Sequence, residues 1–371
     1  MTHADDGSRA PATGAVLRAF DDVTPDVLTG MLRERGWIGD AQVVDAPAET
    51  VGAGLMGVCA RYQLHLDREV PGAPASVVGK FAAPDATTRD FMASSGYRNE
   101  LCFYRHFASQ LAIAAPACAY AAIDDDGWFT LILEDRAPLQ PGDQLRGCTV
   151  GQVEAAVREL VGLHAPRWDA DLGNHACFGG GGGSGLTPDL LAATLQSVVP
   201  GFLERYAAAF TPDAVAFYER FTQSAANWFA ARPTPRTLIH SDYRPDNLLF
   251  SAGEADVAVA VVDWQGFSRG CGMSDVSFLV GNALTPEHRR THEEPIVRAY
   301  HDDLVAAGVT NYSFDEAWDD YACSLLSAML TTIFGAMYGA RTERGDRMFE
   351  LMGARHARQI LDLGGDRFLD A

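Results

Sequence analysis

The stretch from Leu238 to Phe250 reads LIHSDYRPDNLLF, and VAVVDWQ follows at Val259 to Gln265. Each part joins an apolar run to a short polar segment that contains aspartate. The run from Val257 to Val262 has the composition of a buried strand and delivers Asp263 to its end. Asp, Pro and Asn are common turn formers, so either motif alone would be an ordinary turn. Their order and spacing, with strands on both sides, instead predict one active site.

The spacing of His240, Asp242 and Asn247 is that of the HRDxxxxN catalytic loop of protein kinases. In that loop the aspartate accepts the proton of the substrate hydroxyl group, and the asparagine binds Mg²⁺. Asp263 then stands where a second, acidic Mg²⁺ ligand is required. The segment DYRPDN also matches the DLKPEN of many protein kinases, which places Arg244 where it can meet a transferring phosphate.

Upstream, Gly52, Gly54 and Gly57 spell GxGxxG, a pattern that kinases share with the Rossmann fingerprint. The residues that follow separate the two folds. From Val58 to Leu66 apolar and polar residues alternate, which is the period of a strand. A Rossmann loop would open a helix here, so the pattern indicates a glycine turn between two strands, as in kinases.

Lys80 lies within the apolar strand sequence SVVGKF, where an ammonium group is unfavourable unless an anion meets it. Nucleotide phosphates and the carboxylate of Glu100, which opens an apolar helical face, would supply that charge. A solvated helix residue for Glu100 and a surface charge for Lys80 remain the alternatives. The strand from Trp128 to Leu133 then leads to Glu134, the expected hinge whose backbone would bind the nucleotide base. Hinge residues say little about base choice, so both ATP and GTP fit.

The wording of four segments, GYRNELCFYRHF, LILEDRAP, LVGLHAPRW and VDWQ, resembles the aminoglycoside phosphotransferase and choline kinase superfamily. It is closest to the branch with ecdysteroid-kinase-like and acyl-CoA-dehydrogenase-associated phosphotransferases. The resemblance runs from about Phe20 onward and implies an ATP-dependent and Mg²⁺-dependent transfer to a hydroxyl group of a small molecule. It also implies that Asp275, in the glycine-rich turn after Asp263, braces the catalytic loop. The short route between these aspartates excludes the activation segment of a true protein kinase.

The resemblance further implies an α+β, bilobal, protein-kinase-like fold. We expect a disordered tail at 1–19, a nucleotide-binding lobe with a small antiparallel sheet at 20–134, and a mainly helical catalytic and substrate-binding lobe at 135–371. The glycine run from Gly179 to Gly185 is either a lid over the acceptor site or a plain surface connection. A catalytically silent, nucleotide-binding regulatory protein is the alternative function, although no lysine, base or metal position has been lost.

The composition of the chain indicates which partners and which cellular location to expect. The chain has 371 residues with 29 basic and 49 acidic side chains, a formal net charge of −20, which disfavours a nucleic-acid partner. Its seven cysteines are odd in number and form no CxxC pair, so we expect reduced thiols. The opening residues MTHADDGSRAPATGA lack the apolar core of a signal peptide. Together these features predict a cytoplasmic protein.

The uncharged run from Tyr321 to Ala340 is long enough to span a membrane, but its serines, threonines, glycines and tyrosines favour a buried helix. We therefore expect no membrane span. No motif indicates the acceptor or the oligomeric state. Five aromatic residues of the larger lobe either line an acceptor pocket or, as is more usual at helical spacing, belong to the core: Phe202, Tyr206, Phe210, Phe217 and Trp318.

Overall fold

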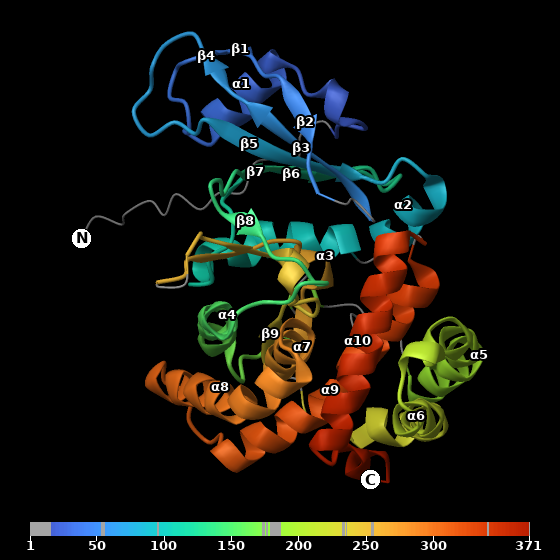
Figure 1. The fold of residues 1–371 in the computed structure, drawn as a ribbon. Coiled ribbons are helices and arrows are strands. Elements are labelled where there is room, and N and C mark those ends of the chain that lie inside the picture. The colour runs from blue at the N-terminus through green and yellow to red at the C-terminus, as the bar shows by residue number, and fades with distance from the viewer. Residues whose placement is uncertain are drawn as a thin grey trace. The chain divides into compact units, whose positions relative to one another are not determined.

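The computed structural model describes residues 16–52, 56–94, 96–172, 175, 177–178, 187–231, 234, 236–253, 256–339 and 341–370. The chain divides into two compact units, Met1–Pro138 with Val262–Phe267, and Leu139–Val261 with Ser268–Ala371. The first contains a small antiparallel sheet and the second is mainly helical, which confirms the predicted α+β class (Figure 1). Gly54, the predicted lid from Gly179 to Gly185 and most of the predicted tail lie outside the described residues.

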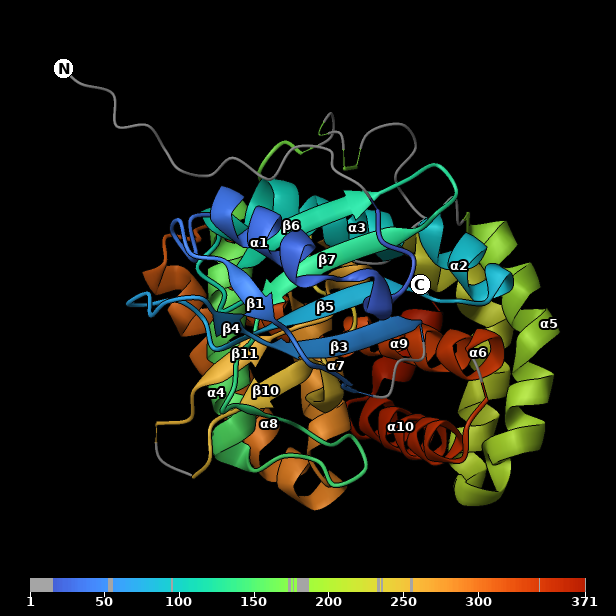
Figure 2. The same cartoon turned by 90° about the horizontal axis from the view of Figure 1, so that it is seen from above.

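The first unit is built on a five-stranded antiparallel sheet with the strand order β2-β3-β5-β7-β6. Figure 2 shows β3, β5, β7 and β6 side by side in this order. The strands are β2 (Ala48–Thr50), β3 (Gly57–Gln63), β5 (Ser76–Ala82), β6 (Cys118–Ile123) and β7 (Phe129–Glu134). A two-stranded sheet pairs β1 (Val43–Asp45) with β4 (His65–Leu66), and the helices are α1 (Pro25–Glu34), α2 (Ala86–Ala93) and α3 (Gly96–Cys102).

Strand alternation decides which side chains of the sheet reach its core. Ala60 and Tyr62 of β3 and Val77 of β5 are buried in one hydrophobic cluster with Leu28 and Leu32 of α1. Lys80 is an odd number of residues from Val77, so it projects from the opposite face of β5. The same alternation that builds the core therefore sends the lysine away from α1.

The second unit consists mainly of helices, and its strands are short. The helices are α4 (Val150–His164), α5 (Pro188–Tyr206), α6 (Pro212–Ala231), α7 (Met273–Ala283), α8 (Pro286–Ala306), α9 (Phe314–Tyr338) and α10 (Glu343–Asp362). Five of them begin after a hydroxyl side chain that accepts a hydrogen bond from the first turn, at Thr149, Thr187, Thr285, Ser313 and Thr342.

Short strands frame the segment that the sequence singled out. Antiparallel pairing joins β9 (Thr237–Ile239) to β12 (Ser268–Gly270), and β10 (Leu248–Phe250) to both β11 (Val259–Val261) and β8 (Gln140–Pro141). The predicted catalytic loop thus lies between β9 and β10, and Asp263 comes two residues after β11. The strand expected at Val257 to Val262 is present, although it is shorter at both ends.

The aromatic residues considered for an acceptor pocket belong mostly to the core. Phe202, Tyr206, Phe210 and Phe217 are buried in the main hydrophobic cluster of the second unit. Trp318 is half-buried and stacks on Tyr321, with ring centroids 5.4 Å apart. The described part of the chain contains one helix long and apolar enough to cross a membrane, α9, and 67% of its most apolar window is buried. A core helix, as predicted, accounts for that burial.

The cysteines correct one expectation. Five of them are free thiols, as predicted: Cys59, Cys118, Cys148, Cys271 and Cys323. Cys102 and Cys177 are disulfide-bonded, so the prediction of reduced thiols is wrong for these two. Neither belongs to a closely spaced pair in the sequence, so spacing could not have indicated it.

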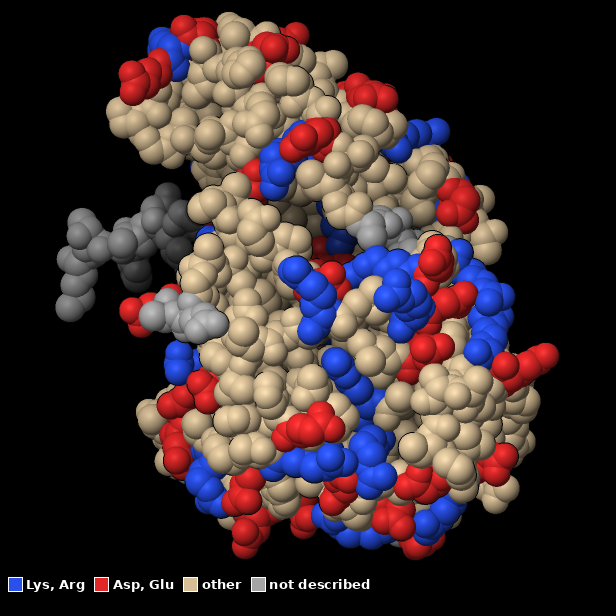
Figure 3. Space-filling model, viewed as in Figure 1, with Lys and Arg blue, Asp and Glu red and all other residues tan. Residues whose placement is uncertain are grey.

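The negative net charge does not form a single acidic patch on the face drawn in Figure 3, where Lys and Arg side chains lie among Asp and Glu side chains. Acidic and basic side chains are therefore mixed on this face.

Candidate active site

Three predicted site residues form a buried charge cluster in the first unit. Lys80 Nζ lies 2.7 Å from Glu100 Oε2 and 2.8 Å from Asp263 Oδ1. Glu100 is completely buried and Lys80 is 8% exposed, whereas the Asp263 side chain is 37% exposed. The chain therefore brings a strand lysine, a helix glutamate and the aspartate after β11 to one point.

The electrostatics of this cluster favour a charged lysine. Burial alone would lower the pKa of Lys80, but the negative charges of Asp263 and Glu100 outweigh it and raise that pKa above its ordinary value. Two carboxylates around one ammonium group leave a net negative charge, and the more exposed carboxylate is Asp263. Asp263 is thus the member of the cluster best suited to meet a cation from solvent.

Aromatic stacking attaches the Val262–Phe267 segment to the first unit. The ring of Trp264 stacks on Phe103 with centroids 3.5 Å apart, and the amide of Trp264 donates to Glu100 Oε1 over 3.3 Å. Asn99 Nδ2 donates to the carbonyl of Gln265 over 3.2 Å. Asp263 itself has a φ of 65°, in the left-handed region that is unfavourable for residues other than glycine. Such local strain is common at functional sites, and here it aims the carboxylate at Lys80.

The glycine turn depends on its glycines for two different reasons. Gly52 has a φ of 77°, which favours glycine. At Gly57 a Cβ would lie 2.6 Å from the carbonyl oxygen of Phe81, so the close approach of β3 to β5 requires glycine there. The hydroxyl of Tyr97 donates to the carbonyl of Met56 and accepts from the amide of Ala83, both over 2.8 Å. Tyr97, which sequence reasoning missed, thus ties the end of this turn to the end of β5.

The predicted hinge residue Glu134 is the last residue of β7, so this strand ends one residue later than the sequence predicted. The Glu134 side chain accepts from the amide of Ala117 over 3.0 Å and lies 3.3 Å from Arg136 Nη1. Its neighbour Asp135 accepts from Arg61 Nε and from the hydroxyl of Ser76, both over 2.6 Å. The side chains of Glu134 and Asp135 are thus occupied by contacts within the first unit.

Four predicted residues lie together in the second unit, in the loop between β9 and β10. Asn247 Nδ2 donates to the carbonyl oxygen and to Oδ2 of Asp242, each over 2.8 Å. Arg244 Nε lies 3.0 Å from Asp242 Oδ1 and 3.2 Å from Oδ2. These donors present the Asp242 side chain, 34% exposed, as a hydrogen-bond acceptor of fixed orientation. Because the side-chain nitrogen of Asn247 donates to Asp242, the side-chain oxygen of Asn247 faces away from Asp242.

An arginine from α10 reaches this loop, and the sequence did not indicate it. Arg344 forms a two-pronged pair with Asp246, with Nη1 to Oδ2 and Nη2 to Oδ1 both at 2.9 Å. Arg244 Nη1 donates to the same Oδ2 of Asp246 over 2.8 Å. Burial alone would raise the pKa of Asp246, but its bonds with both arginines outweigh burial and lower it. The chain of charges therefore runs from α10 through Asp246 and Arg244 to Asp242.

Asp275, at the start of α7, braces the other end of the loop as the resemblance implied. Its carboxylate accepts from the amide of His240 over 2.7 Å and from the amide of Ser241 over 2.9 Å. On its far side, His164 Nε2 lies 3.3 Å from Oδ2, and His164 Nδ1 lies 2.5 Å from the hydroxyl of Tyr300. A buried carboxylate with two amide donors fixes the backbone before Asp242.

The two residues before Asp242 have local structural tasks. His240 is completely buried, and its Nδ1 accepts from the amide of Asp242 over 3.3 Å. Ser241 has a φ of 69°, in the left-handed region that favours glycine. Its hydroxyl group lies 2.9 Å from the hydroxyl group of Ser268. His240 is therefore placed to orient Asp242 and is shielded from solvent.

The donor chemistry of the predicted metal residues suits magnesium. Asp263 supplies carboxylate oxygen and Asn247 supplies amide oxygen, the hard ligands that Mg²⁺ prefers. The residues present thus fit the predicted ion.

A known protein family matches this chain in sequence. A sequence profile described as the phosphotransferase enzyme family matches residues 84–312, more than half of the chain. No curated protein matches the chain significantly in sequence.

Solved structures show the same fold. Choline kinase from Cryptosporidium parvum Iowa II matches with a TM-score of 0.51 and 9% identity, over 92% of this chain and 95% of that one. Ethanolamine kinase from Plasmodium vivax matches with a TM-score of 0.50 and 10% identity, over 88% of this chain and 85% of that one. At these identities the likeness concerns the fold alone, and it confirms the predicted protein-kinase-like architecture.

Proposed function

Because this chain belongs to the phosphotransferase enzyme family, we propose that it transfers the γ-phosphoryl group of ATP to a hydroxyl group of a small molecule. The observation that carries the proposal is the cluster of Lys80, Glu100 and Asp263, since Lys80 and Asp263 are 183 residues apart and yet pair over 2.8 Å. A buried lysine oriented by a helix glutamate is the arrangement with which kinases bind nucleotide phosphates.

In this proposal the first unit binds the nucleotide. Lys80, oriented by Glu100, binds the α and β phosphates, and backbone amides of the turn that contains Gly52, Gly54 and Gly57 cover them. The backbone at Glu134 binds the base, and GTP remains an alternative donor. Asn247 and Asp263 are the proposed ligands of Mg²⁺, which when bound neutralises phosphate charge.

The loop between β9 and β10 acts on the acceptor. Asp242 aligns the acceptor hydroxyl group and takes its proton, and its fixed carboxylate lowers the entropy cost of that alignment. Arg244 holds Asp242 and offers positive charge to the transferring phosphate. We assign His240 a positioning role, because it is completely buried and accepts from the amide of Asp242. Catalysis of this kind is mainly positioning and charge neutralisation.

The proposed acceptor is a hydroxyl compound of one of several classes, namely a hydroxylated lipid or steroid, an acyl thioester, a choline-like alcohol or an antibiotic. The wording of the sequence disfavours aminoglycosides and does not rank the other classes. The cytoplasmic location and the division into lobes at 20–134 and 135–371 stay predictions.

Mass spectrometry of a pooled hydroxyl-compound library tests the proposal. The purified protein is incubated with the pool and Mg-ATP or Mg-GTP, beside an Asp242→Asn variant that keeps the size of the side chain. We expect one compound to gain the mass of a phosphoryl group with the unchanged protein and none with the variant. Nucleotide binding without any product would favour the silent regulatory protein. Equal turnover by Asp242→Asn would remove Asp242 from the proposed role.

A further inference from the structure

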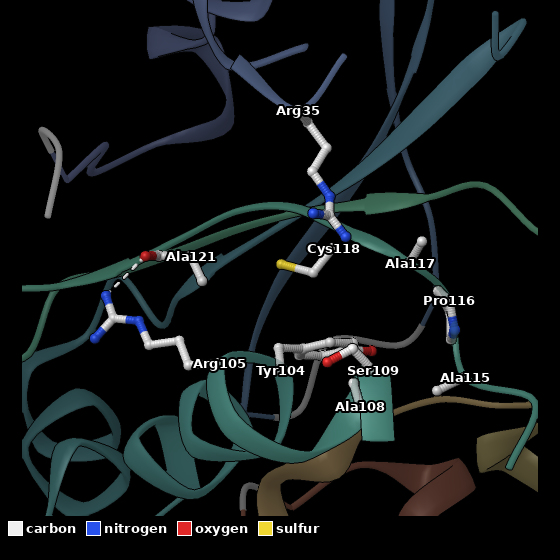
Figure 4. A pocket seen from close by; sticks show the side chains of 10 residues that line it. All are labelled: Arg35, Tyr104, Arg105, Ala108, Ser109, Ala115, Pro116, Ala117, Cys118 and Ala121. Carbon is white, nitrogen blue, oxygen red and sulfur yellow. Dashed lines mark hydrogen bonds between the residues drawn. The ribbon is translucent and has the colours of Figure 1, made fainter. Parts of the chain in front are cut away.

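The first unit contains a cavity of about 180 Å³ between the end of α1, the turn that follows α3, and β6 (Figure 4). Two charged residues line it, Arg35 and Arg105. Arg105 donates to the carbonyl of Ala121 over 2.7 Å, and Arg35 also interacts within the chain. The cavity therefore needs no ligand to balance their charge.

A histidine at the end of α4, in the second unit, has no part yet in the proposed transfer reaction. His164 belongs to LVGLHAPRW, one of the four segments that carry the family resemblance, and it is completely buried. Its Nε2 lies 3.3 Å from Asp275 Oδ2 of α7, and its Nδ1 lies 2.5 Å from the hydroxyl of Tyr300 in α8. Both ring nitrogens thus have a partner, and each partner comes from a different helix.

The chemistry of the two partners gives the direction of these hydrogen bonds. A carboxylate accepts and does not donate, so the proton of the ring lies on Nε2, toward Asp275. Nδ1 of the neutral ring then accepts from the Tyr300 hydroxyl. Burial, together with Cys271 and Asp275, raises the pKa of Tyr300 well above its ordinary value, so the phenol keeps the proton that it donates. The bonds therefore run in one direction, from Tyr300 through His164 to Asp275.

The packing around this chain of hydrogen bonds is tight. Gly272 immediately precedes α7, the helix that carries Asp275. A Cβ at Gly272 would lie 2.9 Å from His164 Nδ1 and 3.0 Å from the Tyr300 hydroxyl oxygen. A glycine thus allows the start of α7 to approach the bond between His164 and Tyr300.

Two more hydrogen bonds attach α4 to the residues on either side of Asp242. The hydroxyl of Thr237, in β9, donates to the carbonyl of His164 over 2.6 Å. The hydroxyl of Tyr243 donates to the carbonyl of Ala156 over 2.7 Å. Thr237 and Tyr243 are both buried, so these bonds are shielded from competition with water. The helix that carries His164 is therefore part of the support of the loop between β9 and β10.

We propose that His164 is a positioning residue for phosphoryl transfer, acting through Asp275 on the loop that carries Asp242; this role rests on the proposed function. Asp275 accepts from the amides of His240 and Ser241 over 2.7 and 2.9 Å. The third donor, His164 Nε2, fixes the rotation of the carboxylate so that both amide bonds persist. Asp242 directly follows Ser241, so the direction of its side chain depends on this backbone.

Hydrogen exchange followed by mass spectrometry, on the full chain without any substrate, tests this role. His164→Leu removes the donor to Asp275, whereas the amide of His164→Gln can still donate to it. The matched control is His356→Leu, which changes another completely buried histidine of the second unit, one that pairs with Thr332 over 3.1 Å.

We expect His164→Leu to speed exchange about tenfold in the peptide that contains His240 and Ser241, because their hydrogen bonds to Asp275 weaken. His164→Gln should restore most of the protection, and His356→Leu should leave this peptide unchanged. Unchanged exchange in His164→Leu, or equal acceleration in His356→Leu, would overturn the proposal. If His164→Leu does not fold, Tyr300→Phe decides. This variant keeps the histidine and removes its donor, so faster exchange in the same peptide supports the role and unchanged exchange overturns it.

Kinetics with the acceptor found in the library provide the second measurement. His164→Leu should lower kcat about tenfold and leave the KM of the nucleotide unchanged, because the groups proposed to bind the nucleotide phosphates and base belong to the first unit. His164→Gln should recover most of kcat. A raised nucleotide KM with unchanged kcat would overturn the positioning role. A protein that phosphorylates no compound would remove the proposed function, whereas the exchange result would still show whether His164 holds the loop, so the two failures are distinguishable.

Discussion

Replacement of Lys80 by methionine should destabilise the protein by leaving Glu100 buried without its counter-ion. Lys80 Nζ lies 2.7 Å from Glu100 Oε2, and the Glu100 side chain is 1% exposed. Removing one partner of a buried ion pair costs about 3–5 kcal/mol, because the other charge stays desolvated. Asp263 contributes less to this cost, since 37% of its side chain remains in contact with solvent.

A double-mutant cycle isolates this pair. Glu100→Gln alone should cost about 1–2 kcal/mol, because Lys80 keeps its bond to Asp263 while one hydrogen bond is weakened. The double variant Lys80→Met with Glu100→Gln carries no stranded charge, so it should lose less stability than the sum of the single changes, by about 2 kcal/mol or more. Urea denaturation followed by circular dichroism gives the free energies of unfolding. Single changes that add to within about 0.5 kcal/mol would refute the reasoning.

The cost of Lys80→Met should also depend on pH. Burial raises the pKa of Glu100 above its ordinary value even beside Lys80, and removal of the lysine raises it further. Between the ordinary glutamate pKa, near 4.3, and the raised pKa of Glu100 in the folded variant, the folded variant retains a proton that the unfolded chain releases. Stability of the variant relative to the unchanged protein therefore falls as the pH rises through this window. A difference in unfolding free energy that is the same at pH 5 and pH 7 would contradict this assignment.

Three further changes test other parts of the site. Asp275→Asn should lower the free energy of unfolding by about 2–3 kcal/mol, because an amide cannot accept from both loop amides without placing its own N–H groups against one of them. Urea denaturation measures this, with Ser277→Ala as the control, since Ser277 is a neighbouring buried residue with only a local hydrogen bond. Equal losses of stability in the two variants would count against a bracing role for Asp275. Arg344→Met should lower kcat about tenfold with little change in KM or in stability, because it loosens the loop that holds the proposed base Asp242. The kinetic control is Arg341→Met, which removes an exposed ion pair outside the loop, and matching rates for both variants would exclude a positioning role for Arg344. Gly57→Ala should lower stability by about 1–3 kcal/mol through the 2.6 Å contact with the Phe81 carbonyl, and an unchanged melting temperature would show that β3 can move aside.

Much of the site could be predicted because kinase chemistry requires particular residue types at short, fixed spacings. Asp242, Arg244 and Asn247 contact one another within a single loop, so their spacing in the sequence already carries their geometry. The strand that bears Lys80 was recognisable from its apolar neighbours, because alternation along a strand is a local property.

Contacts between distant segments were beyond such reasoning. The pair of Arg344 and Asp246 joins residues 98 positions apart, and arginines are common on exposed helix faces, so nothing marked this one. The hydroxyl of Tyr97 binds the glycine turn 41 residues earlier, although at that position a tyrosine reads as an ordinary apolar helix residue. The disulfide-bonded state of Cys102 and Cys177 also depends on the folded arrangement.

The sequence by itself determined which chemical groups are present: the acid, amide and basic groups of the predicted catalytic loop, and the lysine and glutamate of the first unit. It also determined the order of the strands and helices that carry them. These follow from local periodicity and from motifs whose members lie a few residues apart. Only the tertiary structure decided which charges meet and that Gly57 is needed for the approach of two strands. The physical reason is that the burial of a side chain and its hydrogen bonds depend on the residues that surround it in space. Those neighbours are set by the packing of strands and helices around the core, which brings together residues that are distant in the sequence.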